Sequence, residues 1–121
     1  MPNKTETNEF LAYLTQLIEG TNKGSLNWTE ANPTTYTWHS NAPGRGGKVA
    51  IQAVQRRNQY GAKDWYFVFT VAEPTTGVQK LALDGGTDAE VNKKLQELFQ
   101  AIASSITRKG LDFLKSILPQ Q

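Results

Sequence analysis

The fold of this chain is decided by one stretch, Asp64-Trp65-Tyr66-Phe67-Val68-Phe69-Thr70-Val71-Ala72. Its side chains alternate, and aromatic and β-branched residues in that alternation are typical of a pleated strand. One face of the strand is strongly apolar, and it consists of Trp65, Phe67, Phe69 and Val71. The opposite face is half-polar. The stretch therefore predicts a central strand with a core on one side only.

Neighbouring stretches predict further strands. Residues 34–40 alternate aromatic residues with threonines, and residues 48–57 alternate Val49 and Ile51 with more polar residues. Residues 78–84 predict a last strand with Leu81 and Leu83 pointing inward. Residues 25–33 predict only a lead-in or a short edge strand. All the connections are short, which makes neighbouring strands antiparallel.

Helices are predicted at both ends of the chain. Residues 3–19 carry apolar residues at helical spacing behind a capping pair, Asn3 and Glu6, and glycines and asparagine follow them. A second capping box, Thr87 with Glu90, opens a longer amphipathic segment. Gly110 interrupts that segment. Either one helix runs through it at a cost of about 1 kcal/mol relative to alanine, or a second short helix folds back.

These elements predict one α+β domain over residues 1–121. Its architecture is a two-layer sandwich in which an antiparallel meander of three or four strands carries the N-terminal and C-terminal helices on one face.

Composition excludes several classes of protein. The chain has no cysteine, and its 13 basic and 11 acidic residues give a net charge of only +2. That charge is too small to indicate a polyanion partner, and the absence of cysteine excludes a thiol nucleophile and a cysteine metal site. No stretch approaches the ~20 apolar residues of a membrane span, and the polar N-terminus does not resemble a secretory signal. We expect a protein of the cytoplasm that does not bind membranes.

Catalysis is not expected. His39 is the only histidine, and no serine lies in a nucleophile motif. The loop Gly44-Arg45-Gly46-Gly47-Lys48 resembles a phosphate-binding loop, but Val49 and a strand follow it where the motif requires Ser or Thr and a helix. The acidic residues lack the spacing of a calcium loop. We expect no cofactor and no metal, although Arg45 and Lys48 remain candidates for contact with a small anion.

The half-polar face of the sheet offers a second candidate surface. Tyr66 with Arg56 and Lys80 resembles the combination that stacks single-stranded nucleic acid bases between cations, and His39 shares this face. One aromatic residue is fewer than such surfaces carry. An ordinary solvated face and a protein interface are the alternatives.

The C-terminal stripe is the candidate interface between copies of the chain. It consists of Leu111, Leu114, Ile117 and Leu118. Four large apolar residues on a terminal segment require cover, from the sheet edge or from another chain. The sequence thus predicts a non-catalytic binding or assembly module that is homo-oligomeric and captures a protein partner or a small anionic ligand. A single-stranded nucleic-acid-binding protein is the first alternative, and a small enzyme that uses His39 is the second.

Overall fold

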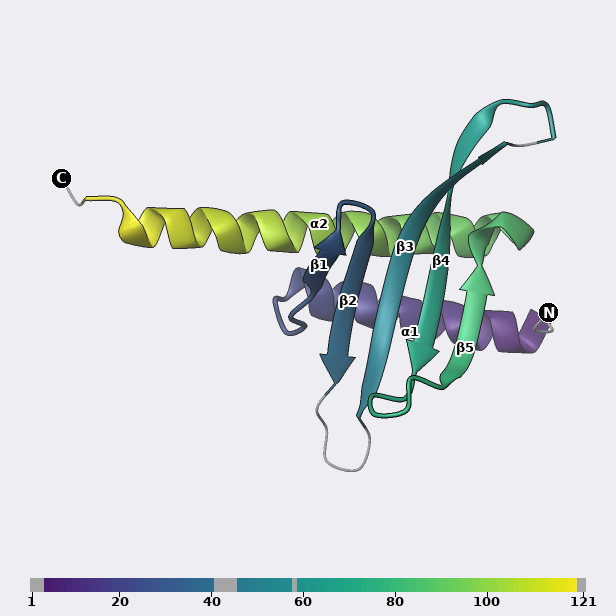
Figure 1. Ribbon diagram of the computed structural model, residues 1–121, viewed down its shortest axis with the longest axis horizontal. Helices are drawn as coiled ribbons and strands as arrows, with labels where there is room; N and C mark the ends of the chain where they lie inside the picture. The colour runs from purple at the N-terminus through teal and green to yellow at the C-terminus, as the bar shows by residue number, and fades with distance from the viewer. Residues whose placement is uncertain (1–3, 41–45, 58, 120–121) are drawn as a thin grey trace.

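Two helices lie side by side against one face of a five-stranded antiparallel sheet (Figure 1). The structure is a computed structural model that describes residues 4–40, 46–57 and 59–119. Its elements, in chain order, are α1 (Lys4–Asn22), β1 (Thr29–Asn32), β2 (Thr35–Ser40), β3 (Gly47–Arg57), β4 (Lys63–Ala72), β5 (Gln79–Asp84), the 3-10 turn η1 (Gly85–Thr87) and α2 (Ala89–Ile117).

The sheet is a simple meander in which each strand pairs with the next. The predicted α+β class, the antiparallel sheet and the two helices on one face are confirmed. The sheet has five strands rather than three or four, because residues 29–32 pair with β2 as an edge strand. All four residues of β1 are exposed, so this strand has no alternation of apolar and polar residues that the sequence could display.

The inner face of the sheet is built on one row of residues that crosses four strands. The pairings align Tyr36, Ile51, Phe69 and Leu83, and all four are buried. Such cross-strand neighbours have Cβ atoms about 5 Å apart, so the row is a continuous apolar ridge. The core therefore lies on the side of β4 that the alternation in residues 64–72 predicts.

The helices cover this ridge with aromatic and aliphatic side chains. Phe10 of α1 meets Phe69 edge-on, with ring centroids 5.4 Å apart. Phe99 of α2 lies 4.9 Å from Tyr36 and 5.2 Å from Phe67, measured between ring centroids. The most deeply buried apolar side chains also come largely from the helices, and they are Leu14, Ile51, Leu95, Leu98 and Ile102.

Trp65 does not join the core, although its parity matches that of Phe67 and Phe69. It pairs with Gln55 on the long β3–β4 hairpin, and it is 52% exposed. Figure 1 shows that this hairpin extends past both helices. Trp65 lies on the inward side of β4, as predicted, but no helix extends far enough to cover its side chain.

Helix α1 runs to Asn22, three residues beyond its predicted end. The extra turn is held by a buried chain of hydrogen bonds, in which Trp28 Nε1 donates to Thr21 Oγ1 over 3.0 Å and Thr21 Oγ1 donates to the Leu17 carbonyl over 2.7 Å. This arrangement satisfies the hydroxyl of Thr21, which is the one buried residue of polar type among the described residues. The predicted cap, Asn3, lies outside the described residues.

Helix α2 begins one residue later than the capping box predicts. Asp88 is the cap, and its carboxylate accepts from the backbone N–H groups of Glu90 and Val91 over 3.0 and 3.2 Å. Thr87 belongs instead to the preceding 3-10 turn and donates its hydroxyl to the Asp84 carbonyl. The prediction that Thr87 caps the helix is therefore wrong, because this short turn occupies the position.

The first turn of α2 also completes the sheet. Asn92 Oδ1 accepts from the Phe67 N–H over 2.9 Å, just beyond the point where β5 ends. Gly85 is packed against this amide so closely that any Cβ at position 85 would collide with it. The Asn92 side chain thus accepts the hydrogen bond from the Phe67 N–H that β5, which has already ended, cannot accept.

Helix α2 is continuous through Gly110, which decides between the two alternatives for the C-terminal segment. No fold-back occurs at residue 110.

Replacing Phe69 by alanine is expected to lower the free energy of unfolding by ~3–5 kcal/mol, because it empties the centre of the inner ridge. Thr70→Ala, one residue along the same strand but on the outer face, is the matched control and should change it by less than about 1 kcal/mol. Urea denaturation followed by circular dichroism measures both. A loss below ~1 kcal/mol for Phe69→Ala would contradict the assignment of the core.

Replacing Gly110 by alanine is expected to raise the free energy of unfolding by up to ~1 kcal/mol. A Cβ at residue 110 meets no atom within 4 Å, and alanine restricts the unfolded chain more than glycine does. The same denaturation experiment on Gly85→Ala should show a loss, because that Cβ meets the Asn92 side chain. A loss at Gly110 would mean that the helix breaks there.

Candidate functional site

Helix α2 is too long for the sheet that it covers. Its 29 residues extend for about 44 Å at 1.5 Å per residue. Five strands spaced by about 4.8 Å form a sheet only about 19 Å wide. Because α2 crosses behind the strands, its C-terminal end projects well past β1 (Figure 1). We call residues 110–118 the terminal segment.

The terminal segment is strongly amphipathic. At 100° per residue its large apolar side chains fall within an arc of about 160°. Every residue from 110 to 119 is exposed. The large apolar side chains are between 46% and 66% exposed, and they are Leu111, Phe113, Leu114, Ile117 and Leu118. A monomeric surface rarely shows so many adjacent large apolar side chains.

Part of this apolar arc continues the side of α2 that packs on the sheet. Ile106 is half-buried against the core, and Phe113 and Ile117 follow it seven and eleven residues later on the same side of the helix. The stripe remains apolar after the sheet beneath it has ended. The four predicted interface residues therefore share one exposed helix face, and Phe113 belongs with them.

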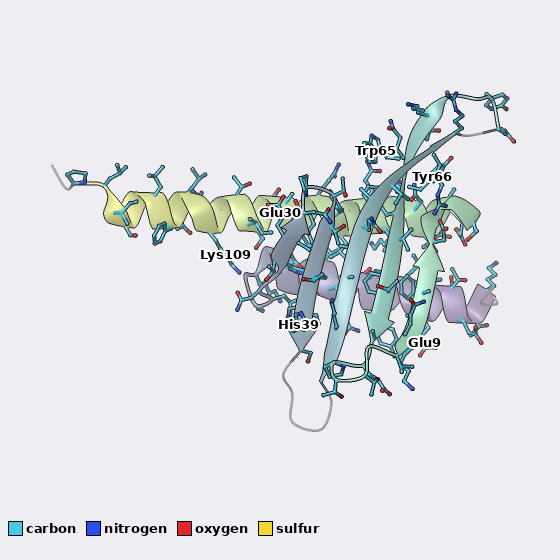
Figure 2. All side chains as sticks on the ribbon, in the orientation of Figure 1. Glu9, Glu30, His39, Trp65, Tyr66 and Lys109 are labelled. Atoms are coloured by element: carbon cyan, nitrogen blue, oxygen red, sulfur yellow. The ribbon has the colours of Figure 1, made fainter. Side chains whose placement is uncertain are left out.

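The junction between this segment and the body is fixed. Lys109 Nζ donates to Asn27 Oδ1 over 2.7 Å, which ties α2 to the loop before β1 (Figure 2). Arg108 and Asp112 form an ion pair of 3.6 Å one turn apart, and the Leu118 N–H closes the helix by donating to the Leu114 carbonyl. The segment thus presents its apolar arc as a continuation of an anchored helix.

The outer face of the sheet is different in character. Its central row runs across all five strands through Thr29, Thr37, Ala50, Thr70 and Ala82. These side chains are small and uncharged, and three of them are half-buried by their neighbours alone. Charged residues lie only toward the two ends of the face.

At the end of the sheet nearer the β3–β4 hairpin, Arg56 is bound to a carboxylate. Its Nη1 lies 2.8 Å from the nearest Asp84 oxygen. Asp84 also accepts from the Gly86 N–H, and the Tyr66 ring lies beside Gly86 (Figure 2). Tyr66 and Arg56 are therefore close, as the sequence hypothesis requires, but the charge of Arg56 is already paired.

Lys80 lies at the other end of β5, far from Tyr66 and Arg56. It forms an ion pair of 3.0 Å with Glu73. The Thr76 hydroxyl and then the Lys80 ammonium lower the pKa of Glu73 by donating to its carboxylate. Lys80 therefore stabilises the β4–β5 turn, and the structure does not bring the three proposed base-stacking residues together.

His39 and Lys48 face each other across β2 and β3 near the same end as Lys80. Arg45 lies outside the described residues. Within residues 4–40, 46–57 and 59–119, no three His, Asp or Glu side chains are grouped as a metal site requires. Neither helix in this part of the chain is both long and apolar enough to cross a membrane.

A groove that the sequence does not reveal lies between α1 and the β5 edge. It has a volume of about 490 Å³ and is lined by Glu6, Glu9, Phe10, Tyr13, Leu81, Ala82 and Leu83. Leu81 faces inward as predicted but stays 40% exposed, and Tyr13 is 54% exposed. We call this surface the α1–β5 groove. Its sequence signal is weak, because only the packing of α1 against β5 brings these residues together.

Comparisons with known proteins add no further identification. No protein-family model matches the chain, and searches of curated proteins and of solved structures found no match.

Proposed function

We propose that this protein is a non-catalytic assembly module of the cytoplasm that binds copies of itself through the terminal segment of α2. The observation that carries the proposal is the overhang of α2, which leaves an apolar helix face without cover beyond the sheet. The absence of cysteine supports the assignment to the cytoplasm.

The magnitudes favour reversible assembly. Complete burial of a Leu, Ile or Phe side chain is worth about 1.5–3 kcal/mol, so a half-exposed one has roughly half of that to gain. If two copies each bury the five side chains of the arc, the gross gain is about 8–15 kcal/mol. Association costs about 4–15 kcal/mol, which offsets most of this gain, so we expect the assembly to be weak and reversible.

The sheet surface gives less support to the other candidate functions. Arg56 and Lys80 are each paired with a carboxylate, and the central row of the outer face carries no charge. A surface that binds phosphates gains affinity from cations that release counterions. The charge pattern therefore supports protein association rather than capture of a nucleic acid or a small anion.

Light scattering coupled to a sizing column tests the proposal. The wild-type chain should form oligomers whose population rises with protein concentration and that persist at ~50 and ~500 mM salt, because apolar contacts are not screened. Leu114→Glu should weaken association at least tenfold, or about 1.4 kcal/mol, by placing a charge in the apolar arc.

Ser116→Glu is the matched control, because it places the same charge in the last turn of the helix but outside the arc. It should weaken association far less than Leu114→Glu does, because it lowers the positive charge of the segment but leaves the apolar arc intact. A wild-type chain that stays monomeric at every concentration would overturn the proposal, as would equal association of Leu114→Glu and the wild type.

A short single-stranded oligonucleotide added to the same runs should leave the elution unchanged. A shift that occurs only at ~50 mM salt would instead support the nucleic-acid alternative, since phosphate contacts weaken steeply with salt. It would direct mutagenesis to Tyr66 and Arg56.

A further inference from the structure

We propose that the terminal segment of one copy docks in the α1–β5 groove of the next copy, so that the chains join head to tail. The inference rests on the proposed function and adds to it by naming the surface that receives the segment. Three features support it, namely the positions of the two surfaces, their apolar character and their charges.

The two surfaces lie at opposite ends of the molecule. Figure 1 shows the C-terminal end of α2 at one end of the longest axis and the N-terminal end of α1, beside β5, at the other. The segment is the end of one continuous helix, so it stays at its own end of the molecule. The segment therefore cannot reach the groove of its own chain, but a second copy placed along the axis can supply it.

Both surfaces are apolar, and their forms suit each other. The apolar lining of the groove includes Phe10, Tyr13 and Leu81, from one face of α1 and the edge of the sheet. An amphipathic helix that lies in such a groove inserts anchors spaced by three and four residues. Leu111, Leu114 and Leu118 have that spacing. Docking would cover apolar groups that are half-exposed on each partner.

The charges around the two surfaces are opposite. Two carboxylates, Glu6 and Glu9, line the groove, and Glu9 accepts from the Tyr13 hydroxyl over 3.2 Å. The end of α2 carries Arg108, Lys109 and Lys115 against a single carboxylate, Asp112. A basic helix in an acidic groove gains from charge complementarity.

A symmetric pair of terminal segments lacks this gain. It would set the excess positive charge of one copy against the same charge of its partner. The charge pattern thus favours the groove over a second terminal segment as the receiving surface.

Head-to-tail contact has a consequence for the size of the assembly. A contact between two different surfaces leaves one of each free at the ends of every complex, so that growth continues unless a ring closes. We therefore expect the mean mass to keep rising with concentration beyond that of a dimer.

Mixing two defective variants tests the proposal. Leu114→Glu damages the segment and leaves the groove intact, whereas Leu81→Glu damages the groove and leaves the segment intact. Each variant alone should be monomeric in light scattering. An equimolar mixture should form a one-to-one dimer and nothing larger, because only one intact pair of surfaces remains.

Controls keep the outcome interpretable. Tyr13→Glu replaces a more exposed groove residue on α1, so it repeats the test without altering the sheet edge. Gln52→Glu adds the same charge on the outer face of the sheet and should assemble as the wild type does. Circular dichroism confirms that each variant is folded.

Two results would overturn the head-to-tail contact while leaving the proposed function standing. The first is wild-type assembly by both groove variants while Leu114→Glu is monomeric, which points to pairing of terminal segments. The second is tighter association as salt rises from ~50 to ~500 mM, as repulsion between like charges requires. The docked arrangement should instead loosen by about twofold to fivefold as salt screens its opposite charges. A monomeric wild type would remove the proposed function itself.

Discussion

The apolar ridge on the inner face of the sheet is the constraint on which the rest of the structure depends. Four buried residues from four strands form it, with Phe69 near its centre. A face of this kind must be removed from water, and α1 and α2 perform that task with Phe10, Phe99 and fully buried leucines. The positions of both helices follow from the need to cover this ridge.

The two candidate interaction surfaces are the apolar parts of the helices and of the sheet edge that remain exposed after α1 and α2 have packed on the sheet. Helix α2 fits the sheet for only part of its length, and its apolar side continues where no strand lies beneath it. At the opposite end, Leu81 at the β5 edge and Tyr13 of α1 are both partly exposed and line the α1–β5 groove. The molecule thus carries two apolar surfaces at its opposite ends, an exposed helix face and a groove.

Local patterns predicted the features that local chemistry decides. The alternation in residues 64–72 identifies a central strand, and helical spacing identifies both helices. The same alternation gives the direction of the Trp65 side chain but not its exposure, because the exposure depends on how far the helices reach. The cap at Asp88 was missed because a 3-10 turn of three residues displaced the helix start. Edge strand β1 has no buried side to give an alternation.

The candidate surfaces also differ in how far the sequence predicts them. The apolar stripe at the C-terminus is visible in the sequence, since helical periodicity alone places its members on one face. The grouping of Tyr66, Arg56 and Lys80 rests on alternation along the strands. Alternation predicts which face of the sheet a residue lies on, but not how near it lies to residues on other strands. The α1–β5 groove joins residues about 70 positions apart in the chain, and such a contact has no local signature.

The meander topology also sets the order in which the fold can form. Every strand pairs with its sequence neighbour, so the hairpins close short loops, which is fast. The contact between α1 and α2 spans residues 23–88 and must close last. On a ribosome the sheet is complete before α2 emerges, and its inner face then has only α1 as cover. Until α2 emerges, the nascent chain presents the aromatic ridge to any chaperone that binds exposed apolar strands.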